Sequence, residues 1–128
     1  MPACAGPDGA DQKLLPGATK LLYVVTTVSP ITSIAENIGG TRVHLVGIIP
    51  EGVNSHTFEP APSVAEIASE ADLIILNGLF LEEPFLHMAK TNSKPDAVIL
   101  LLGDQAISEK EWIFDFAFPQ SDGHPNPH

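Results

Sequence analysis

Four short apolar runs alternate with stretches of helical periodicity through most of the chain. Their consecutive β-branched and aliphatic positions are typical of strands buried on both faces, at residues 21–27, 42–49, 72–76 and 97–102. Three helices are predicted between them, at residues 29–38, 63–70 and 81–90. Strands and helices that alternate in this order predict an α/β fold with a four-stranded parallel sheet flanked by helices.

The predicted helix boundaries depend on capping residues. Ser29 is expected to cap the first helix, Pro30 to occupy its first position, and the glycine pair at 39–40 to end it. An i, i+3, i+4, i+7 spacing gives this helix one apolar face, made of Ile31, Ile34, Ala35 and Ile38. A capping box from Ser63 to Glu66 predicts the start of the second helix.

The two ends of the chain differ from its middle. Residues 1–19 contain several prolines and glycines and no periodic pattern, so we expect a disordered tail or a tether, with the folded domain at residues 20–128. Cys4, the single cysteine, has small neighbours. It is compatible with the end of a bacterial lipoprotein signal and equally with a stray cysteine in a tail.

Near the other end, large aromatic residues alternate with other residues, a period of two that favours an extended segment with one aromatic face: Trp112, Phe114, Phe116 and Phe118. That face packs either on this domain or on something missing. In the second case the isolated domain is expected to self-associate.

Composition and charge exclude some classes of function. The chain has 128 residues, 44% of them hydrophobic, which suits one folded domain. Sixteen acidic residues against six basic ones give a net charge of −10, which argues against nucleic acid as a partner. No apolar run approaches the roughly 20 residues that a membrane-spanning helix needs.

Two of the five histidines lie in polar loops stiffened by proline. His56 is in the loop of residues 52–63, just after the carboxyl end of the second strand, where ligands of parallel α/β sheets bind. His128 closes the chain. Imidazole is the commonest metal ligand in proteins, so these two histidines are candidates for half of a transition-metal site. Their separation of 72 residues excludes a local motif and makes spacing alone weak support. For His44 and His87 we expect structural or surface roles. His124 is a candidate for a further ligand, but a position in a mobile loop is favoured.

Other chemistries have less support in the sequence. There is no G-x-G-x-x-G after the first strand, no P-loop and no G-x-S-x-G elbow. Among the carboxylates, Glu59 alone is retained, as a hydrogen-bond partner for His56 or as an acceptor that stabilises the loop.

Several motifs in this order resemble a family, the metal-binding lipoproteins that serve ABC importers of manganese, zinc or iron. The segment from Pro50 to Ser63 is similar to the first-ligand loop of that family, Pro-x-Gly-x-x-x-His-x-x-Glu-Pro-x-Pro. Asn126-Pro127-His128 resembles the Asp-Pro-His of the second ligand, with Asn in place of the usual Asp. Further resemblance lies in residues 24–31, 38–40, 71–78 and 81–82.

The resemblance implies a metal-binding role for this chain. It implies that His56 and His128 are the first two ligands, and that residues 20–128 are the N-terminal lobe of a two-lobed protein whose second lobe, absent here, supplies two more ligands. The cargo would be a divalent transition metal, zinc or manganese, with iron also in the family. The partner would be the membrane permease of an ABC transporter. The location would be extracytoplasmic, with Cys4 as a lipid anchor.

Two other functions are weighed against this one. A metal-dependent hydrolase fragment would use Glu59 as a base beside a metal-bound water, but the order of the motifs argues against an enzyme. A surface adhesin or scaffold would keep its partner binding after chelation and after His56→Ala.

Overall fold

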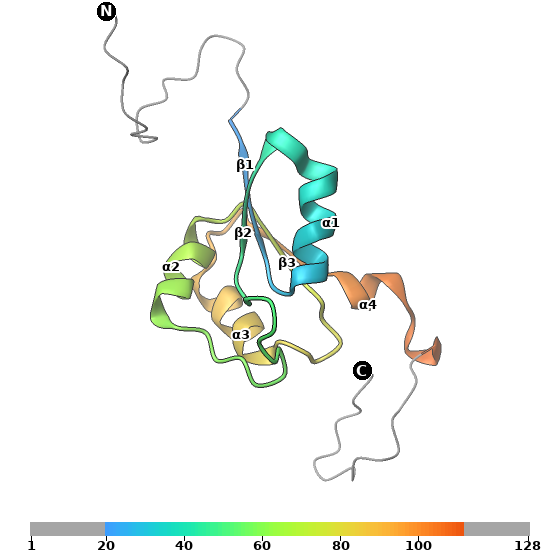
Figure 1. Cartoon of the computed structure of the whole chain (residues 1–128). Coiled ribbons are helices and arrows are strands. Elements are labelled where there is room, and N and C mark those ends of the chain that lie inside the picture. Colours follow the sequence, from blue (N-terminus) through green and yellow to red (C-terminus); the bar gives the residue numbers. More distant parts are fainter. Residues whose placement is uncertain (1–19, 112–128) are drawn as a thin grey trace, which may run out of the picture.

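The computed structural model describes residues 20–111, which form one sheet with helices on both of its faces (Figure 1). Their elements are β1 (Leu22–Thr26), α1 (Ser29–Gly39), η1 (Gly40–Arg42), β2 (Val43–Gly47), α2 (Pro62–Glu70), β3 (Leu73–Leu76), α3 (Glu83–Asn92), β4 (Val98–Leu101), α4 (Leu102–Ala106) and η2 (Glu109–Glu111). Within this range, no helix has both the length and the apolar character to cross a membrane.

The sheet has four parallel strands in the order β2-β1-β3-β4. Val24 of β1 lies beside Leu45 of β2 on one side and Leu73 of β3 on the other, and Ile74 of β3 lies beside Ile99 of β4. The predicted fold class, a four-stranded parallel sheet flanked by helices, is confirmed. The chain first adds β2 on one side of β1 and then crosses over to add β3 on the other side. The winding direction therefore reverses between β1 and β3.

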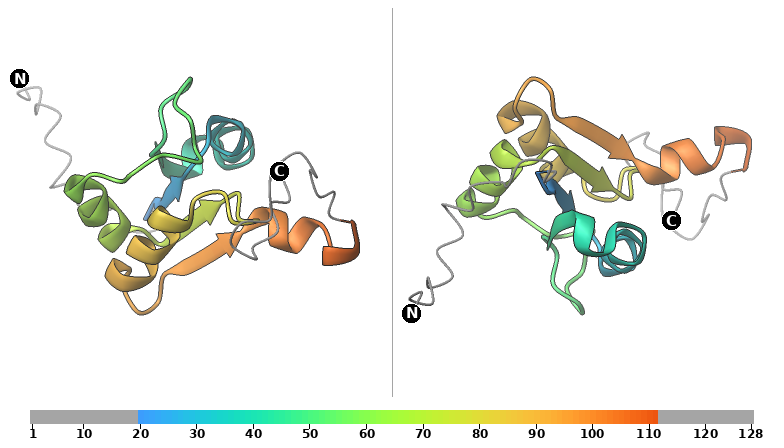
Figure 2. Two further views of the ribbon diagram at one scale, coloured as in Figure 1. Left: turned by 90° about the horizontal axis from the view of Figure 1, so that it is seen from below. Right: turned by 90° about the horizontal axis from the view of Figure 1, so that it is seen from above.

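Helices α2 and α3 pack on one face of the sheet and α1 on the other (Figure 2). Side chains alternate along each strand, so Val25 and Ile74 point to the α2–α3 face while Val24 and Ile75 point to the α1 face. The fully buried core lies on the α2–α3 face, where Phe85 of α3 is its largest member.

Both predicted N-caps are wrong by one residue or more. The N-cap of α1 is Val28, which has an extended conformation, and Ser29 is already the first residue of the helix. Helix α2 begins at Pro62, with Ala61 as its cap and no capping hydrogen bond from a side chain, so the expected box from Ser63 to Glu66 is not formed. Proline has its φ fixed near the helical value and suits the first turn, so each helix includes its proline there.

The other boundaries are close to expectation. Helix α1 ends at Gly39, and Gly40 follows with a positive φ of 53°, as the glycine pair predicted. Strands β2 and β4 are shorter than their apolar runs, and Leu102 begins α4, a helix that the pattern did not predict. The expectations for residues 1–19 and 112–128 lie outside the described residues.

Candidate metal centre

The loop that carries His56 leaves the sheet at the carboxyl end of β2. Ile48 and Ile49 are buried and extend the pairing beyond Gly47, since their N–H groups donate to the carbonyl oxygens of Thr26 and Thr27 at 2.9 and 3.1 Å. The chain then turns at Pro50 and enters the His56 loop at the carboxyl edge of the sheet, where the metal site was predicted. The predicted position of His56 beyond the carboxyl end of a strand is therefore correct.

Local hydrogen bonds give the loop a defined shape around its histidine. The backbone N–H of His56 donates to the side-chain Oδ1 of Asn54 at 2.9 Å, and the N–H of Thr57 donates to the carbonyl of Asn54 at 3.3 Å. Gly52 has a φ of 83°, a left-handed value that glycine adopts without strain. These contacts orient the backbone at His56, whose side chain is exposed.

A cavity of about 350 Å³ lies beside this loop at the carboxyl edge of the sheet. Its walls come from the segments that follow three strands, namely Val28, Ser29 and Pro30 after β1, Ile49, Pro50, Gly52, Val53 and Ser55 after β2, and Asn77 and Leu81 after β3. Ser55, directly before His56, lines it. The cavity lies at the point where the winding direction reverses, which is where parallel α/β sheets bind ligands.

A buried carboxylate connects two of these walls. Glu82 is only 3% exposed and accepts hydrogen bonds from the hydroxyl of Thr27 at 2.5 Å and from the backbone N–H groups of Asn77 and Gly78 at 2.8 and 3.1 Å. The segment after β1 is thereby joined to the segment after β3. Sequence reasoning missed this role, because the only local signal was an acidic residue soon after the Asn77-Gly78 turn.

The remaining predicted residues fall into two groups. His44 lies on β2 with its ring 4.8 Å from that of Tyr23, and His87 is exposed on α3, so both have the structural or surface positions expected. Glu59 is exposed, three residues beyond His56 in the same loop, and its role stays a prediction. His128, His124 and Cys4 lie outside the described residues.

Across residues 20–111, no three His, Cys, Asp or Glu side chains come together in a group that could hold a metal ion. Histidine on a loop with a fixed backbone is a suitable donor for zinc or a similar metal, but one imidazole is far from the usual four donors.

The sequence matches a family described as "ZnuA: Zinc-uptake complex component A periplasmic" over residues 24–128, which is most of the chain. The chain belongs to the ZnuA family. Family membership confirms the resemblance to metal-binding proteins of ABC importers that the motifs suggested.

Curated relatives of this ZnuA-family chain have names that refer to metals and transport. It is 44% identical over 66 residues to the metal ABC transporter substrate-binding lipoprotein FimA of Streptococcus parasanguinis, a match that covers 52% of this chain and 21% of FimA. It is 38% identical over 77 residues to the manganese-binding lipoprotein MntA of Halalkalibacterium halodurans, covering 60% of this chain and 26% of MntA. The chain thus spans about a fifth to a quarter of these relatives.

Solved structures of the ZnuA type share the fold. The periplasmic zinc-binding protein TroA from Treponema pallidum superposes with a TM-score of 0.68 at 26% identity, over 77% of this chain and 35% of TroA. A manganese-bound periplasmic metal-binding protein from Candidatus Liberibacter asiaticus gives 0.67 at 30% identity, over 84% of this chain and 37% of that one. The described fold therefore corresponds to one part of these binding proteins.

Proposed function

We propose that this chain is the metal-capturing N-terminal lobe, residues 20–128, of an extracytoplasmic solute-binding protein, and that it takes up zinc or manganese for the membrane permease of an ABC importer. His56 and His128 are its two metal ligands. The observation that carries the proposal is the family match over residues 24–128, which spans both histidines. The position of His56 beside a cavity at the carboxyl edge of the sheet supports it.

The proposal includes a tether at residues 1–19 with Cys4 as its lipid anchor. The names of the relatives support this, because FimA and MntA are lipoproteins and TroA is periplasmic. These proteins are transport-associated binding proteins, which favours capture of a metal over hydrolysis with Glu59 as a base.

Two imidazoles make an incomplete site. Zinc sites in proteins usually have four protein donors, or three with one open position, so a pair of histidines binds weakly and leaves the other positions to water. Imidazole suits zinc better than manganese, and zinc stands above manganese in general affinity for nitrogen donors. The isolated chain should therefore bind zinc weakly and manganese more weakly still.

Calorimetric titration of the chain with zinc and then with manganese tests the proposal. We expect one weak zinc site that disappears in His56→Ala and in His128→Ala, because either change leaves a single imidazole. His87→Ala is the matched control, since His87 is also exposed but lies on α3, and it should bind as the wild type does. Zinc binding that is unchanged in His56→Ala would remove His56 from the site and refute the assignment.

A further inference from the structure

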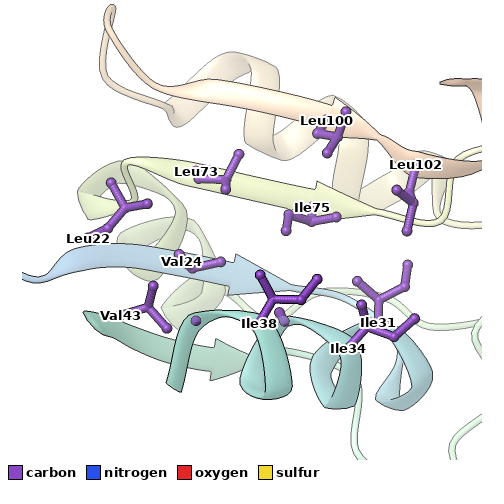
Figure 3. A pocket seen from close by; sticks show the side chains of 12 residues that line it. Leu22, Val24, Ile31, Ile34, Ile38, Val43, Leu73, Ile75, Leu100 and Leu102 are labelled. Atoms are coloured by element: carbon purple, nitrogen blue, oxygen red, sulfur yellow. The ribbon is translucent and has the colours of Figure 1, made fainter. Parts of the chain in front are cut away.

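The α1 face of the sheet carries an apolar groove that the described residues leave partly open. The groove has a volume of about 310 Å³, and its lining is apolar throughout. Side chains from α1 and from all four strands surround it, among them Ile34, Ile38, Val43, Leu73, Ile75 and Leu100 (Figure 3). The predicted apolar face of α1 does point to the sheet, but the helix covers only part of that face.

Exposure differs strongly between the two faces of the sheet. On the α2–α3 face, Ile74 and Leu76 are completely buried. On the α1 face, Ile34 and Ile38 remain 51% and 81% exposed, and Leu22 of β1 is 44% exposed. Moving an apolar side chain from water into a packed site is favourable, roughly in proportion to the apolar area that is buried. A segment that filled the groove would therefore gain stability from several side chains at once.

The chain continues from one end of this groove. Leu102, the first residue of α4, is itself part of the lining, and α4 and η2 lead from it to Glu111, the last described residue. The next residues are the alternating segment 112–118, whose aromatic positions are Trp112, Phe114, Phe116 and Phe118. The sequence thus supplies four large apolar side chains a few residues after α4, the helix that borders the groove.

We propose that segment 112–118 lies in the groove between α1 and the strands β3 and β4, with its aromatic side chains against the apolar lining. Its length is sufficient, because seven extended residues span about 23 Å and the 11 residues of α1 span about 16 Å. Asp115 belongs to the other side of the alternation, so this arrangement does not require its charge to enter the groove. The proposal does not depend on metal binding.

A second copy of the chain is the rival occupant, and tethering favours the chain's own segment. Only five residues, 107–111, separate α4 from Trp112. A short linker holds a segment near its site at an effective concentration in the millimolar range. A second copy at micromolar concentration would have to bind about a thousandfold more tightly to compete.

Fluorescence tests the proposal directly, because Trp112 is the only tryptophan of the chain. In the native full chain we expect its emission to be shifted to the blue of the urea-unfolded chain and protected from acrylamide, equally at low and high protein concentration. Ile38→Asp puts a charge into the groove and should move the emission most of the way to that of the unfolded chain. Asn37→Asp is the matched control. It adds the same charge at the exposed position directly before Ile38, outside the lining, and should leave the emission unchanged.

Folding of each variant is checked by far-UV circular dichroism, and Ile38→Ser replaces Ile38→Asp if the charged variant does not fold. Native emission equal to that of the unfolded chain would overturn the proposal, and so would a blue shift that Ile38→Asp leaves intact. A blue shift that grows with concentration, together with a dimer in sedimentation, would assign the groove to a second copy and also overturn it.

Discussion

At the scale of single residues, Glu82 is a charged-type side chain that the fold buries and fully surrounds with hydrogen-bond donors. Its buried carboxylate accepts hydrogen bonds from one hydroxyl and two backbone N–H groups. Next to it, Leu79 and Phe80 have φ values of 53° and 65°, left-handed values that cost energy for residues other than glycine. The hydrogen bonds to Glu82 help to hold this strained turn beside the cavity.

Replacing Glu82 should therefore cost much more stability than replacing its neighbour. Glu82→Ala removes the acceptor of two buried donors and one half-buried donor, and we expect a loss of roughly 2–4 kcal/mol in the free energy of unfolding. Glu82→Gln keeps one carbonyl acceptor and should lose less. Urea denaturation followed by circular dichroism measures both.

The matched control for this pair is Glu83→Ala, since Glu83 is exposed in the first turn of α3. It should change stability by no more than about 0.5 kcal/mol. Equal losses for Glu82→Ala and Glu83→Ala would show that the buried hydrogen bonds contribute nothing specific.

Residue-level prediction from the sequence found the end of α1, missed both N-caps by one residue or more, and could not find contacts between residues far apart in the chain. The end of α1 at the glycine pair depends on neighbouring residues, and it was predicted. The role of Glu82 depends on Thr27, 55 residues earlier in the chain, which only the sheet brings close. No pattern within a few residues could have shown that contact.

At the scale of elements, Asp72 joins the starts of three strands. Its carboxylate accepts from the backbone N–H of Tyr23 at 2.8 Å and from the ammonium group of Lys94. Its backbone donates to the carbonyl of Tyr23 and accepts from the N–H of Val98. The hydrogen bond from Lys94, followed by that from Tyr23, lowers the pKa of Asp72 below its usual value. The amino ends of β1, β3 and β4 are thus connected through one side chain and its own backbone.

This connection should make stability depend on pH in the acid range. Because the pKa of Asp72 is lower in the folded state, its contribution is present above the unfolded pKa of about 3.9 and is lost as the pH falls through the folded value. We expect the stability difference between wild type and Asp72→Asn to be largest near pH 6 and to shrink below about pH 4. Urea denaturation at several pH values measures it.

The control for Asp72→Asn is Glu36→Gln, which replaces a carboxylate on the exposed side of α1. A difference between wild type and Asp72→Asn that stayed constant from pH 6 to the acid limit would contradict the assigned role of the Asp72 charge.

The elements themselves were largely predictable, because buried parallel strands leave continuous apolar runs that are easy to recognise. The start of helix α4 was missed because it lies inside such an apolar run. The run of residues 97–102 is apolar to its end, but Leu102 already belongs to the helix that follows β4. Composition alone could not separate a strand residue from a helix residue within that run.

At the scale of the whole molecule, the sequence placed His56 at the correct edge of the sheet but could not describe the site. The order of strands and helices was sufficient for the edge, since ligand loops follow the carboxyl ends of parallel strands. The cavity needs the segments after β1, β2 and β3 together, and their relative positions follow from the strand order, which the pattern does not specify. The pairing of His56 with His128 stays a prediction.

The net charge of −10 leads to a prediction about salt. An excess of one sign destabilises the compact state by self-repulsion, and salt screens it, with a Debye length that falls from about 30 Å at 0.01 M to about 8 Å at 0.15 M. Thermal unfolding at pH 7 should therefore move to higher temperature as sodium chloride is added over this range.

The control is the same experiment near pH 4.6, the isoelectric point of the sequence, where positive and negative charges balance. The effect of salt should be much smaller there. The same response at both pH values would mean that self-repulsion is not its cause.

The strand order also sets a sequence of events in time. Strand β2 begins 17 residues after β1 ends, whereas β3, the other neighbour of β1, begins 47 residues after it. At a synthesis rate of about 5–20 residues per second, the second neighbour arrives roughly 2–9 s after β1 itself. Until then one edge of β1 has its N–H and C=O groups unpaired, so β1, an inner strand of the finished sheet, has an exposed edge while the chain is being made.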